Sequence, residues 1–377
     1  MPKFGKRGKK SLAAISKFVG RNKADISKVD GISLEEEAAS GPSLWCIVGA
    51  DGAVATAAAS DLNDWTAYVS ANMGTKDYNS IAFGKDGGGS SLWVAVDSNG
   101  NREIRYTSDP TNTSGWSDAN VAANMIGIAW GNNVWVAVGG SGKVYRSTDG
   151  ATWSAVNMSG VSGWNGSTTI YEVVSDGAGN WMCAQDMDVF HSTDDASTWT
   201  RVADFTDTGT DGGALSGYKA YTMAYTSDRW SVFMRKAGNS RVFTAAAAST
   251  STWTRSTPTN TNQAIVSQAA RRMAGGAGTV IIVASNDTSR STDGGQTWTK
   301  NVNDLPRTDA RDIATDGQGN WIVVHDSGRV SLSSDDGVTW SEQTGDQYNG
   351  NTNLRFPSGG TNIENLDAVC ADVLLPV

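Results

Sequence analysis

The sequence predicts an all-β protein, a seven-bladed β-propeller of four-stranded antiparallel blades, preceded by a basic N-terminal arm. Three observations predict it. Tryptophans recur in two alternating series along the 377 residues, strand-length apolar runs are separated by Gly, Asn and Asp turns, and the body shows no sustained helical period. The composition is consistent with this fold. The chain has 43 Gly, 15 Trp and 7 Pro, which is typical of a protein with many turns and a core that contains indole side chains.

The two tryptophan series define seven phrases. One series lies inside short apolar runs and comprises Trp45, Trp93, Trp135, Trp181, Trp230 and Trp321, with Val280 in the sixth place. The other series ends each phrase and comprises Trp65, Trp116, Trp153, Trp199, Trp253, Trp298 and Trp340. The phrases repeat at roughly the 40 to 50 residues that a four-stranded propeller blade needs.

Each phrase has the same internal order. In the third phrase, residues 125–131 form an apolar run, and further runs at 134–139, 143–148 and 152–156 follow after Gly-rich or Asn-rich turns. Runs of this length, bounded by turn residues, are typical of strands. We therefore expect each phrase to form one small antiparallel sheet.

The first phrase lacks a first strand, and the end of the chain supplies one. The segment 44–49 resembles a second strand, but the polar residues before it cannot form the first. Residues 365–373 resemble the first strands of other phrases and have no second strand after them. We expect the two segments to pair and close the ring, because an open ring would leave unpaired backbone at a blade edge. Cys46 and Cys370 then lie on neighbouring strands, which need not mean a disulfide.

The polar turn before the second Trp series resembles a known repeat. Residues 291–298, STDGGQTW, match the Asp-box (BNR repeat) pattern Ser-x-Asp-x-Gly-x-Thr-Trp throughout. STDGATW at 147–153 and SDDGVTW at 334–340 match with one residue fewer, and STDDASTW at 192–199 has Ala196 in place of the glycine. The resemblance covers residues 41–377 and implies a propeller; it does not specify an activity.

The residue types of the box indicate a structural role. The aspartates can accept backbone N–H bonds two residues onward, the glycines can supply a positive φ, and the Trp can pack into the sheet. The residues expected to hold these turns are Asp149, Gly150, Trp153, Asp194, Trp199, Asp293, Gly295, Trp298, Asp336, Gly337 and Trp340.

The N-terminal arm, residues 1–40, differs from the body in charge. Residues 1–30 hold nine basic and two acidic residues, a net charge of +7, so the rest of this −9 chain carries −16. We expect the arm to dock onto a partner. The phrase ISKVDGIS at 26–33 resembles the leaders of virion structural proteins of tailed, especially marine, bacteriophages. The expected docking residues are Lys3, Lys6, Arg7, Lys9, Lys10, Ile15, Phe18, Ile26 and Val29.

Several chemistries find no support in the sequence. Three cysteines without a Cys-x-x-Cys spacing favour free thiols, and two histidines argue against a His-rich metal centre. No metal or cofactor is expected.

The sequence also gives no sign of membrane insertion or secretion. No run approaches the ~20 apolar residues of a membrane span, and the N-terminus lacks a clear signal-peptide cleavage site. The acidic body argues against nucleic-acid binding by the propeller, whose basic residues cluster only at 235–241 and 271–272.

Sialidases share the Asp-box, but the residues of their catalytic site do not match this sequence. Sialidases have an arginine triad, a Phe-Arg-Ile-Pro segment and a nucleophilic Tyr with a Glu partner. The nearest match here is LRFPSGG, in which Arg355, Phe356 and Pro357 stand in another order and near the C-terminus. Trp164, in a long insertion, could stack on a sugar or fold back onto its own loop.

These observations favour a non-enzymatic virion structural protein. The arm would dock onto the capsid or tail assembly, and the propeller would project as a decoration or host-contact module. Its partners would be other virion proteins and a host surface glycan or receptor, and it would reach the virion from the host cytoplasm without a signal peptide. Two alternatives stay open: a glycan-binding or glycoside-hydrolysing propeller, and a cellular Asp-box scaffold or assembly factor.

Overall fold

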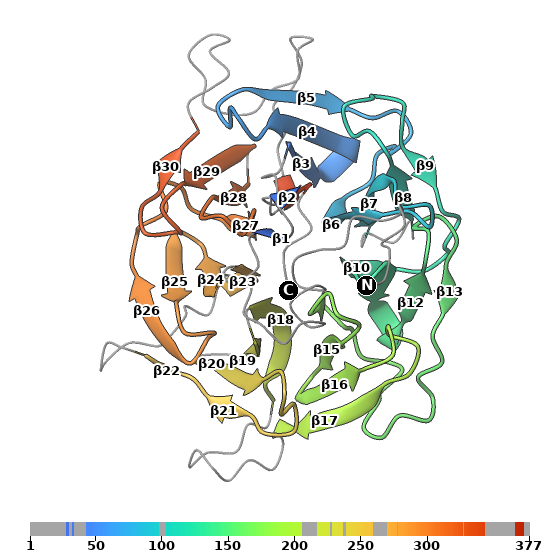
Figure 1. Ribbon diagram of the computed structural model, residues 1–377, viewed down its shortest axis with the longest axis vertical. Helices are drawn as coiled ribbons and strands as arrows, with labels where there is room; N and C mark the ends of the chain where they lie inside the picture. The colour runs from blue at the N-terminus through green and yellow to red at the C-terminus, as the bar shows by residue number, and fades with distance from the viewer. Residues whose placement is uncertain are drawn as a thin grey trace. The chain divides into compact units, whose positions relative to one another are not determined.

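Seven antiparallel sheets surround one axis in the body of the protein (Figure 1). The computed structural model describes residues 28–29, 32–33, 43–97, 103–205, 217–226, 228–236, 239–258, 270–276, 278–326, 328–343 and 366–372. The chain divides into two units, Met1–Gly41 and Pro42–Val377. The second unit confirms the predicted all-β propeller of seven four-stranded blades.

The strands follow the predicted order within each blade. Blade 1 contains β31 (Leu366–Ala371), β3 (Leu44–Gly49), β4 (Ala53–Ala58) and β5 (Trp65–Val69). Blade 2 contains β6 (Tyr78–Lys85), β7 (Ser91–Asp97), β8 (Ile104–Thr107) and β9 (Ser117–Asp118). Blade 3 contains β10 (Met125–Gly131), β11 (Val134–Gly139), β12 (Val144–Ser147) and β13 (Ser154–Ala155). Blade 4 contains β14 (Val173–Ser175), β15 (Trp181–Gln185), β16 (Asp188–Ser192) and β17 (Thr200–Asp204).

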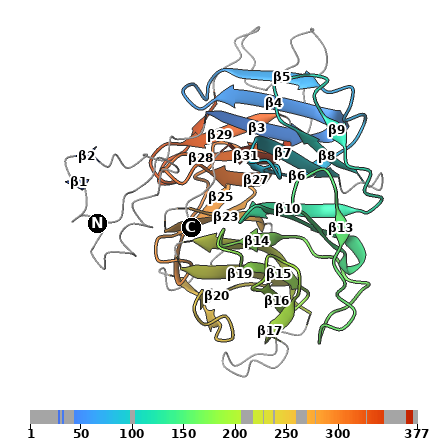
Figure 2. The same cartoon turned by 45° about the vertical axis from the view of Figure 1, so that its right-hand side comes forward.

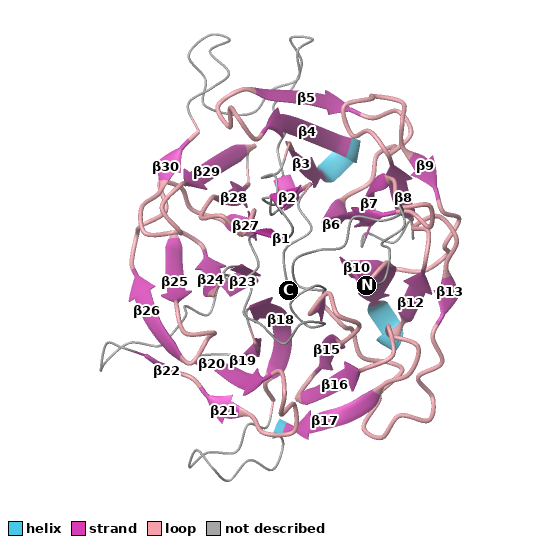
Figure 3. Cartoon of the chain, viewed as in Figure 1, coloured by secondary structure: helices cyan, strands magenta, loops and turns pink. Residues whose placement is uncertain are grey.

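The remaining blades repeat the arrangement, with one addition. Blade 5 contains β18 (Lys219–Thr226), β19 (Arg229–Lys236), β20 (Asn239–Ala246) and β21 (Thr254–Arg255). Blade 6 contains β23 (Ala270–Gly276), β24 (Thr279–Ala284), β25 (Asp287–Ser291) and β26 (Thr297–Asn301), and blade 7 contains β27 (Ala310–Thr315), β28 (Trp321–His325), β29 (Arg329–Ser333) and β30 (Ser341–Glu342). The two-residue strand β22 (Thr257–Pro258) pairs in parallel with β26, so blade 6 has a fifth strand that was not predicted. Figure 3 shows strands and loops throughout, with helix confined to short turns such as η2 (Ala50–Gly52) and η3 (Gly140–Gly142).

The hydrophobic core lies between adjacent blades. The second strands are buried on both faces, as in β11 and β24, in which every residue is buried. That burial explains why these strands are continuous apolar runs and do not alternate with polar residues. The cluster that joins blades 6 and 7, for example, contains Ile281 and Val283 from one blade and Trp321 and Val323 from the other. All members of the first Trp series are buried, and so is Val280.

The C-terminal segment closes the ring as predicted. Strand β31 pairs antiparallel with β3, and Cys46 lies directly opposite Cys370; both are free thiols. Figure 2 shows β31, β3, β4 and β5 side by side. The carboxylate of Asp372 accepts hydrogen bonds from the backbone N–H groups of Ser43 and Leu44, at 2.6 and 2.9 Å. These bonds fix the two ends of blade 1 to each other, so the last strand is held by side-chain contacts as well as by the sheet.

The arm is described only in part. Strands β1 (Lys28–Val29) and β2 (Ile32–Ser33) form an antiparallel pair in which Val29 is opposite Ile32. The other expected docking residues lie outside the described residues: Lys3, Lys6, Arg7, Lys9, Lys10, Ile15, Phe18 and Ile26.

His325 makes the stability of blade 7 depend on pH. Its side chain is fully buried, its Nδ1 lies 3.0 Å from the Thr308 carbonyl oxygen and its Nε2 lies 2.8 Å from the Ser331 hydroxyl. Burial lowers the pKa of His325 to about 4, from an ordinary value of 6.5. The unfolded chain therefore takes up this proton at a higher pH than the folded protein does, and stability is lost as the pH falls from 6.5 towards 4.

We expect this single group to cost about 3 kcal/mol of unfolding free energy across that interval. Urea titrations at pH 7 and pH 4.5 will check it in the wild type and in His325→Gln. The loss between the two pH values should be smaller in the variant. An equal loss in both proteins would show that His325 does not titrate on unfolding.

Candidate functional site on the propeller axis

The antiparallel topology gives the propeller two different faces. In every blade the turns between strands one and two, and between strands three and four, lie at one face, which we call the turn face. The turns between strands two and three and the connections between blades lie at the opposite face, which we call the connection face. Loops at one face of a rigid scaffold are the usual place for a binding site.

The turn face carries the repeated Ser-Asp-Thr-Trp turns, and their side chains hold the backbone. In blade 6 the Asp293 carboxylate accepts hydrogen bonds from the backbone N–H groups of Gln296 and Thr297 and from the Ser291 and Thr297 hydroxyls. Asp149 and Asp194 make equivalent bonds in blades 3 and 4. Partial burial raises the pKa of Asp293, but these bonds outweigh it and leave the pKa below its ordinary value.

Blade 7 requires a correction. The carboxylate that holds its turn belongs to Asp335, which accepts bonds from the Ser333 hydroxyl and the Thr339 backbone N–H, and not to Asp336. Asp336 occupies the next position with a φ of 60° and pairs with Arg290 at 2.6 Å. A match that starts at Ser334 is one residue short and places Asp336 at the Asp position. Started at Ser333, all eight positions match without a deletion.

The box glycines take the conformation that the turn needs. Gly150, Gly295 and Gly337 have φ values of 72°, 84° and 76°. Blade 4 has Ala196 at this position with a φ of 60°, so an alanine is held there in the left-handed region.

One hydrogen bond recurs in five of the seven turns, including two that lack the Asp and Gly of the box. The indole N–H of Trp298 donates to the carbonyl of Gly295, three residues earlier, at 2.8 Å. The same spacing occurs for Trp153 and Trp199, and also for Trp65 and Trp253, whose boxes have lost their Asp and Gly. The retained Trp therefore still closes the turn in blades 1 and 5.

Charged side chains from several blades meet on the axis near the connection face. The guanidinium of Arg272, on the first strand of blade 6, donates to the Glu172 carboxylate at 2.7 Å and to the Asn79 carbonyl at 3.1 Å. Its Nε lies 3.8 Å from the Asp312 carboxylate. Because Asn79, Glu172 and Arg272 belong to blades 2, 4 and 6, which are not neighbours, they can meet only across the centre of the ring. We call these residues the axial cluster.

The axial cluster also reaches blade 1. The second oxygen of Asp312 accepts the backbone N–H of Val369, in the closing strand β31, at 3.0 Å. Arg272 and its two carboxylate partners keep only about 15% of their side-chain surface exposed. Five of the seven blades are therefore joined at the axis through one arginine, one glutamate and one aspartate.

Burial gives the carboxyl groups here unusual acidities. It raises the pKa of Glu172 to about 7, although Arg272 acts in the opposite direction. Burial likewise raises the pKa of Asp367 to about 6 against the effect of Arg311, and it raises the pKa of Asp312. A carboxyl group whose pKa is about 7, such as that of Glu172, can exchange a proton near neutral pH. In this structure the carboxylates of Glu172 and Asp312 both lie against Arg272, which links their blades.

Aromatic residues flank the axis on the same face. Tyr171 and Tyr221 stack with ring centroids 5.1 Å apart, and the Arg235 guanidinium lies 3.9 Å from the Tyr221 ring. Lys236 and Arg241 both lie over the ring of Tyr218. The basic cluster at 235–241 is therefore packed on tyrosines.

Other predicted features are placed as follows. Arg355, Phe356 and Pro357, the nearest sialidase-like match, lie outside the described residues. In the described part of the chain, no group of three or more His, Cys, Asp or Glu side chains is arranged to hold a metal ion. Within the same residues, no helix has the length and apolar character that crossing a bilayer requires.

Comparison with known proteins identifies the architecture. The sequence matches no protein-family profile and no curated protein. The structure is similar to YCF48 bound to D1 peptide, with 14% identity, a TM-score of 0.51 and coverage of 71% of this chain and 81% of that one. The likeness establishes the fold.

Two further structures show how varied such propellers are. The GH74 xyloglucanase from Xanthomonas campestris has 15% identity and a TM-score of 0.55; the match covers 80% of this chain and 52% of the xyloglucanase. The WD40 β-propeller domain of Doa1 has 11% identity and a TM-score of 0.53, with 77% and 88% covered. The neighbours thus include a glycoside hydrolase and a protein bound to a peptide.

Proposed function

We propose that the protein is a non-enzymatic structural protein of a tailed-bacteriophage virion. The basic arm docks onto the capsid or tail assembly, and the propeller projects from it as a decoration or host-contact module. The protein is made in the host cytoplasm and binds other virion proteins through the arm. The resemblance of residues 26–33 to phage leaders and the charge contrast between arm and body support this assignment.

The observation that carries the proposal is the charge contrast between the arm and the body. Residues 1–30 carry a net charge of +7, and the rest of the chain carries −16. A basic arm on an acidic body indicates that the arm binds a partner that the body does not bind.

The carboxylates of the described residues support a non-enzymatic role. Those of the turn face hold backbone N–H groups, and those of the axial cluster hold Arg272. Each of these groups has a structural partner. The alternative role as an assembly factor is supported by the similarity to YCF48 bound to D1 peptide. In both proposals the propeller binds a partner, but the partner differs.

One observation favours the hydrolase alternative: Glu172 and Asp312 converge on one point, as glycosidase carboxylates do. A hydrolase would release reducing sugar from a xyloglucan or β-glucan and would lose this activity in Glu172→Gln. We expect the wild type to release none.

Deleting residues 1–40 tests the proposal. We expect a soluble propeller that is absent from purified particles, because the arm supplies the docking contacts and the closed ring lies wholly in the remaining residues. Quantitative mass spectrometry of particles from complemented infections measures incorporation. A full-length variant with Lys3, Lys6, Arg7, Lys9 and Lys10 replaced by Gln separates charge from length. Undiminished incorporation of the deletion variant would refute the docking role.

A further inference from the structure

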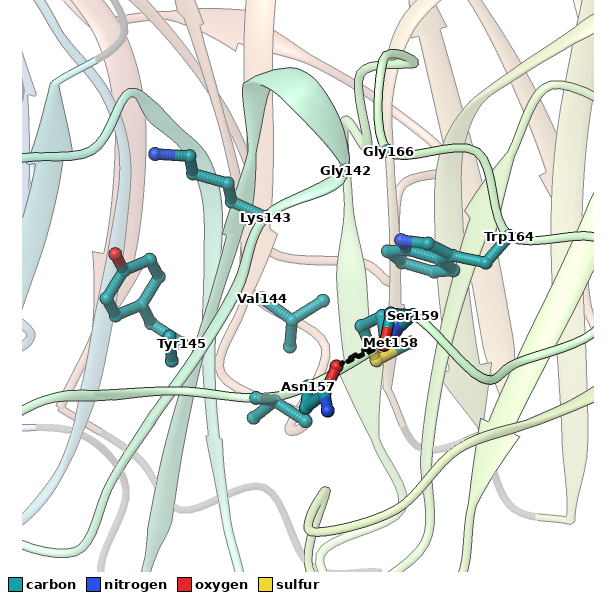
Figure 4. Close-up of a pocket in the computed structure, with 11 residues that line it drawn as sticks. Gly142, Lys143, Val144, Tyr145, Asn157, Met158, Ser159, Trp164 and Gly166 are labelled. Atoms are coloured by element: carbon teal, nitrogen blue, oxygen red, sulfur yellow. Dashed lines mark hydrogen bonds between the residues drawn. The ribbon is translucent and has the colours of Figure 1, made fainter.

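A pocket opens beside blade 3 on the connection face. It has a volume of about 430 Å³, within the range of small-molecule sites, and lies between the start of β12 and the segment 155–166 that leads to blade 4 (Figure 4). Val144 and Met158, both buried, provide an apolar floor, and the Trp164 indole extends towards them from the opposite side. The pocket thus combines an aromatic wall with an apolar base.

The loop that carries Trp164 is fixed by polar contacts. The amide of Gln185, in blade 4, donates to the carbonyls of Asn165 and Thr168 at 2.7 and 2.9 Å and accepts the Asn165 backbone N–H at 2.8 Å. The backbone N–H of Gly142, at the edge of the pocket, donates to the Thr168 carbonyl at 2.7 Å. A buried glutamine that makes three bonds to one loop preorganises that loop, which lowers the entropic cost of binding a ligand.

Trp164 itself is held in place while part of its surface stays open. Its ring meets Phe190 edge to face, with centroids 4.7 Å apart and an interplanar angle of 74°. The side chain is only half-buried, and none of the described residues accepts a hydrogen bond from its indole N–H. The sequence left open whether Trp164 stacks on a sugar or folds back onto the protein. The two are compatible, because the indole packs against Phe190 and still presents a surface to the pocket.

Polar groups with spare hydrogen-bonding capacity line the rim. The Asn157 side-chain oxygen accepts the N–H and hydroxyl of Ser159 at 3.1 and 2.8 Å, and its NH₂ group donates no hydrogen bond to a described residue. Lys143, at the end of the pocket nearest β12, is exposed and forms no ion pair with a described residue. The indole N–H, the amide and the ammonium group are all donors, so the pocket suits a ligand rich in oxygen acceptors.

We propose that this pocket binds a pyranose unit of a glycan. A pyranose presents a patch of C–H groups on one face, which packs on an indole, and hydroxyl and ring oxygens around its edge, which accept hydrogen bonds from the rim. A purely apolar ligand would leave the donors unsatisfied, and a small anion would not use the aromatic wall. This inference deepens the host-contact part of the proposed function and rests on it for its biological meaning.

Glycine substitutions provide a test at the pocket. Gly166 lines the pocket, and a Cβ added there would meet no atom within 4 Å, so Gly166→Leu is expected to place a bulky side chain at the pocket lining. Gly160, in the same segment but outside the pocket lining, has equally open surroundings, and Gly160→Leu is the matched control. Trp164→Ala removes the aromatic wall, and a melting curve checks that this variant is folded.

The probes are maltose, cellobiose, lactose and N,N′-diacetylchitobiose at millimolar concentration, with binding to the full-length protein followed by saturation-transfer NMR. We expect at least one disaccharide to bind wild type and Gly160→Leu, and to bind Gly166→Leu and Trp164→Ala at least tenfold more weakly. Failure of all four to bind wild type, or equal binding by Gly166→Leu, would overturn the assignment. Because the measurement needs no particle, its result is independent of whether the arm docks.

Discussion

A chain that lacks residues 364–377 is expected not to form the propeller. The deletion removes β31, whose Ala368, Val369 and Ala371 are buried, and exposes the backbone of β3 along its full length. It also removes the bonds from Asp372 to Ser43 and Leu44 and the contact of Val369 with the axial cluster. Circular dichroism should show no cooperative thermal transition.

The matched control removes only residues 373–377 and keeps β31 with Asp372. This variant should melt within a few degrees of the full-length protein. If the longer deletion also melted cooperatively near the wild-type temperature, the closing strand would not be needed for the fold.

Replacing Trp298 by Ala is expected to destabilise the protein by about 3 to 5 kcal/mol, the cost typical of a fully buried aromatic side chain. Trp298 has no exposed surface and packs between blades 5 and 6 with Phe233, Met273 and Ile282. Its replacement would also free the Gly295 carbonyl, which accepts the indole N–H. Equilibrium unfolding in urea measures the loss.

Trp340 in blade 7 provides the comparison. It occupies the same place in its phrase but is only half-buried, and its indole N–H has no partner among the described residues. Trp340→Ala should therefore cost clearly less than Trp298→Ala. Equal costs would mean that burial and the turn hydrogen bond do not set the contribution of this Trp series.

Features that recur along the chain could be predicted from the sequence. A blade packs on both sides, so its second strand must be apolar throughout, and the runs around Trp135 and Trp321 therefore identified strands directly. The pairing of β31 with β3 could be predicted because the first phrase lacks a first strand, and the C-terminal segment resembles a first strand with no second strand after it. The pairing of Cys46 with Cys370 was a consequence of that strand pairing.

Features that depend on contacts across the ring could not be predicted. Arg272, Glu172 and Asp312 are separated by about a hundred and forty residues of sequence at most, yet nothing local distinguishes them from other charged residues at strand starts. Their meeting depends on which side chains point to the axis. The parallel strand β22 has only two residues, which carry no periodicity. Asp335 and Asp336 are adjacent, so the sequence alone leaves the register of the blade 7 turn ambiguous.

The connection face brings together the features that local sequence did not reveal. The axial cluster links five blades at the centre of the ring, and the Trp164 pocket lies at the periphery of the same face. The turn face carries the repeated structural turns.

Hydrogen exchange in β31 tests the closed ring most directly, because it measures the terminal strand in the intact protein. The account predicts that the amides of residues 366–371 exchange as slowly as those of β3, their partner strand, and that both segments lose protection together as urea is added. Rapid exchange in residues 366–371, while the strands of blades 2 to 7 stay protected, would contradict it.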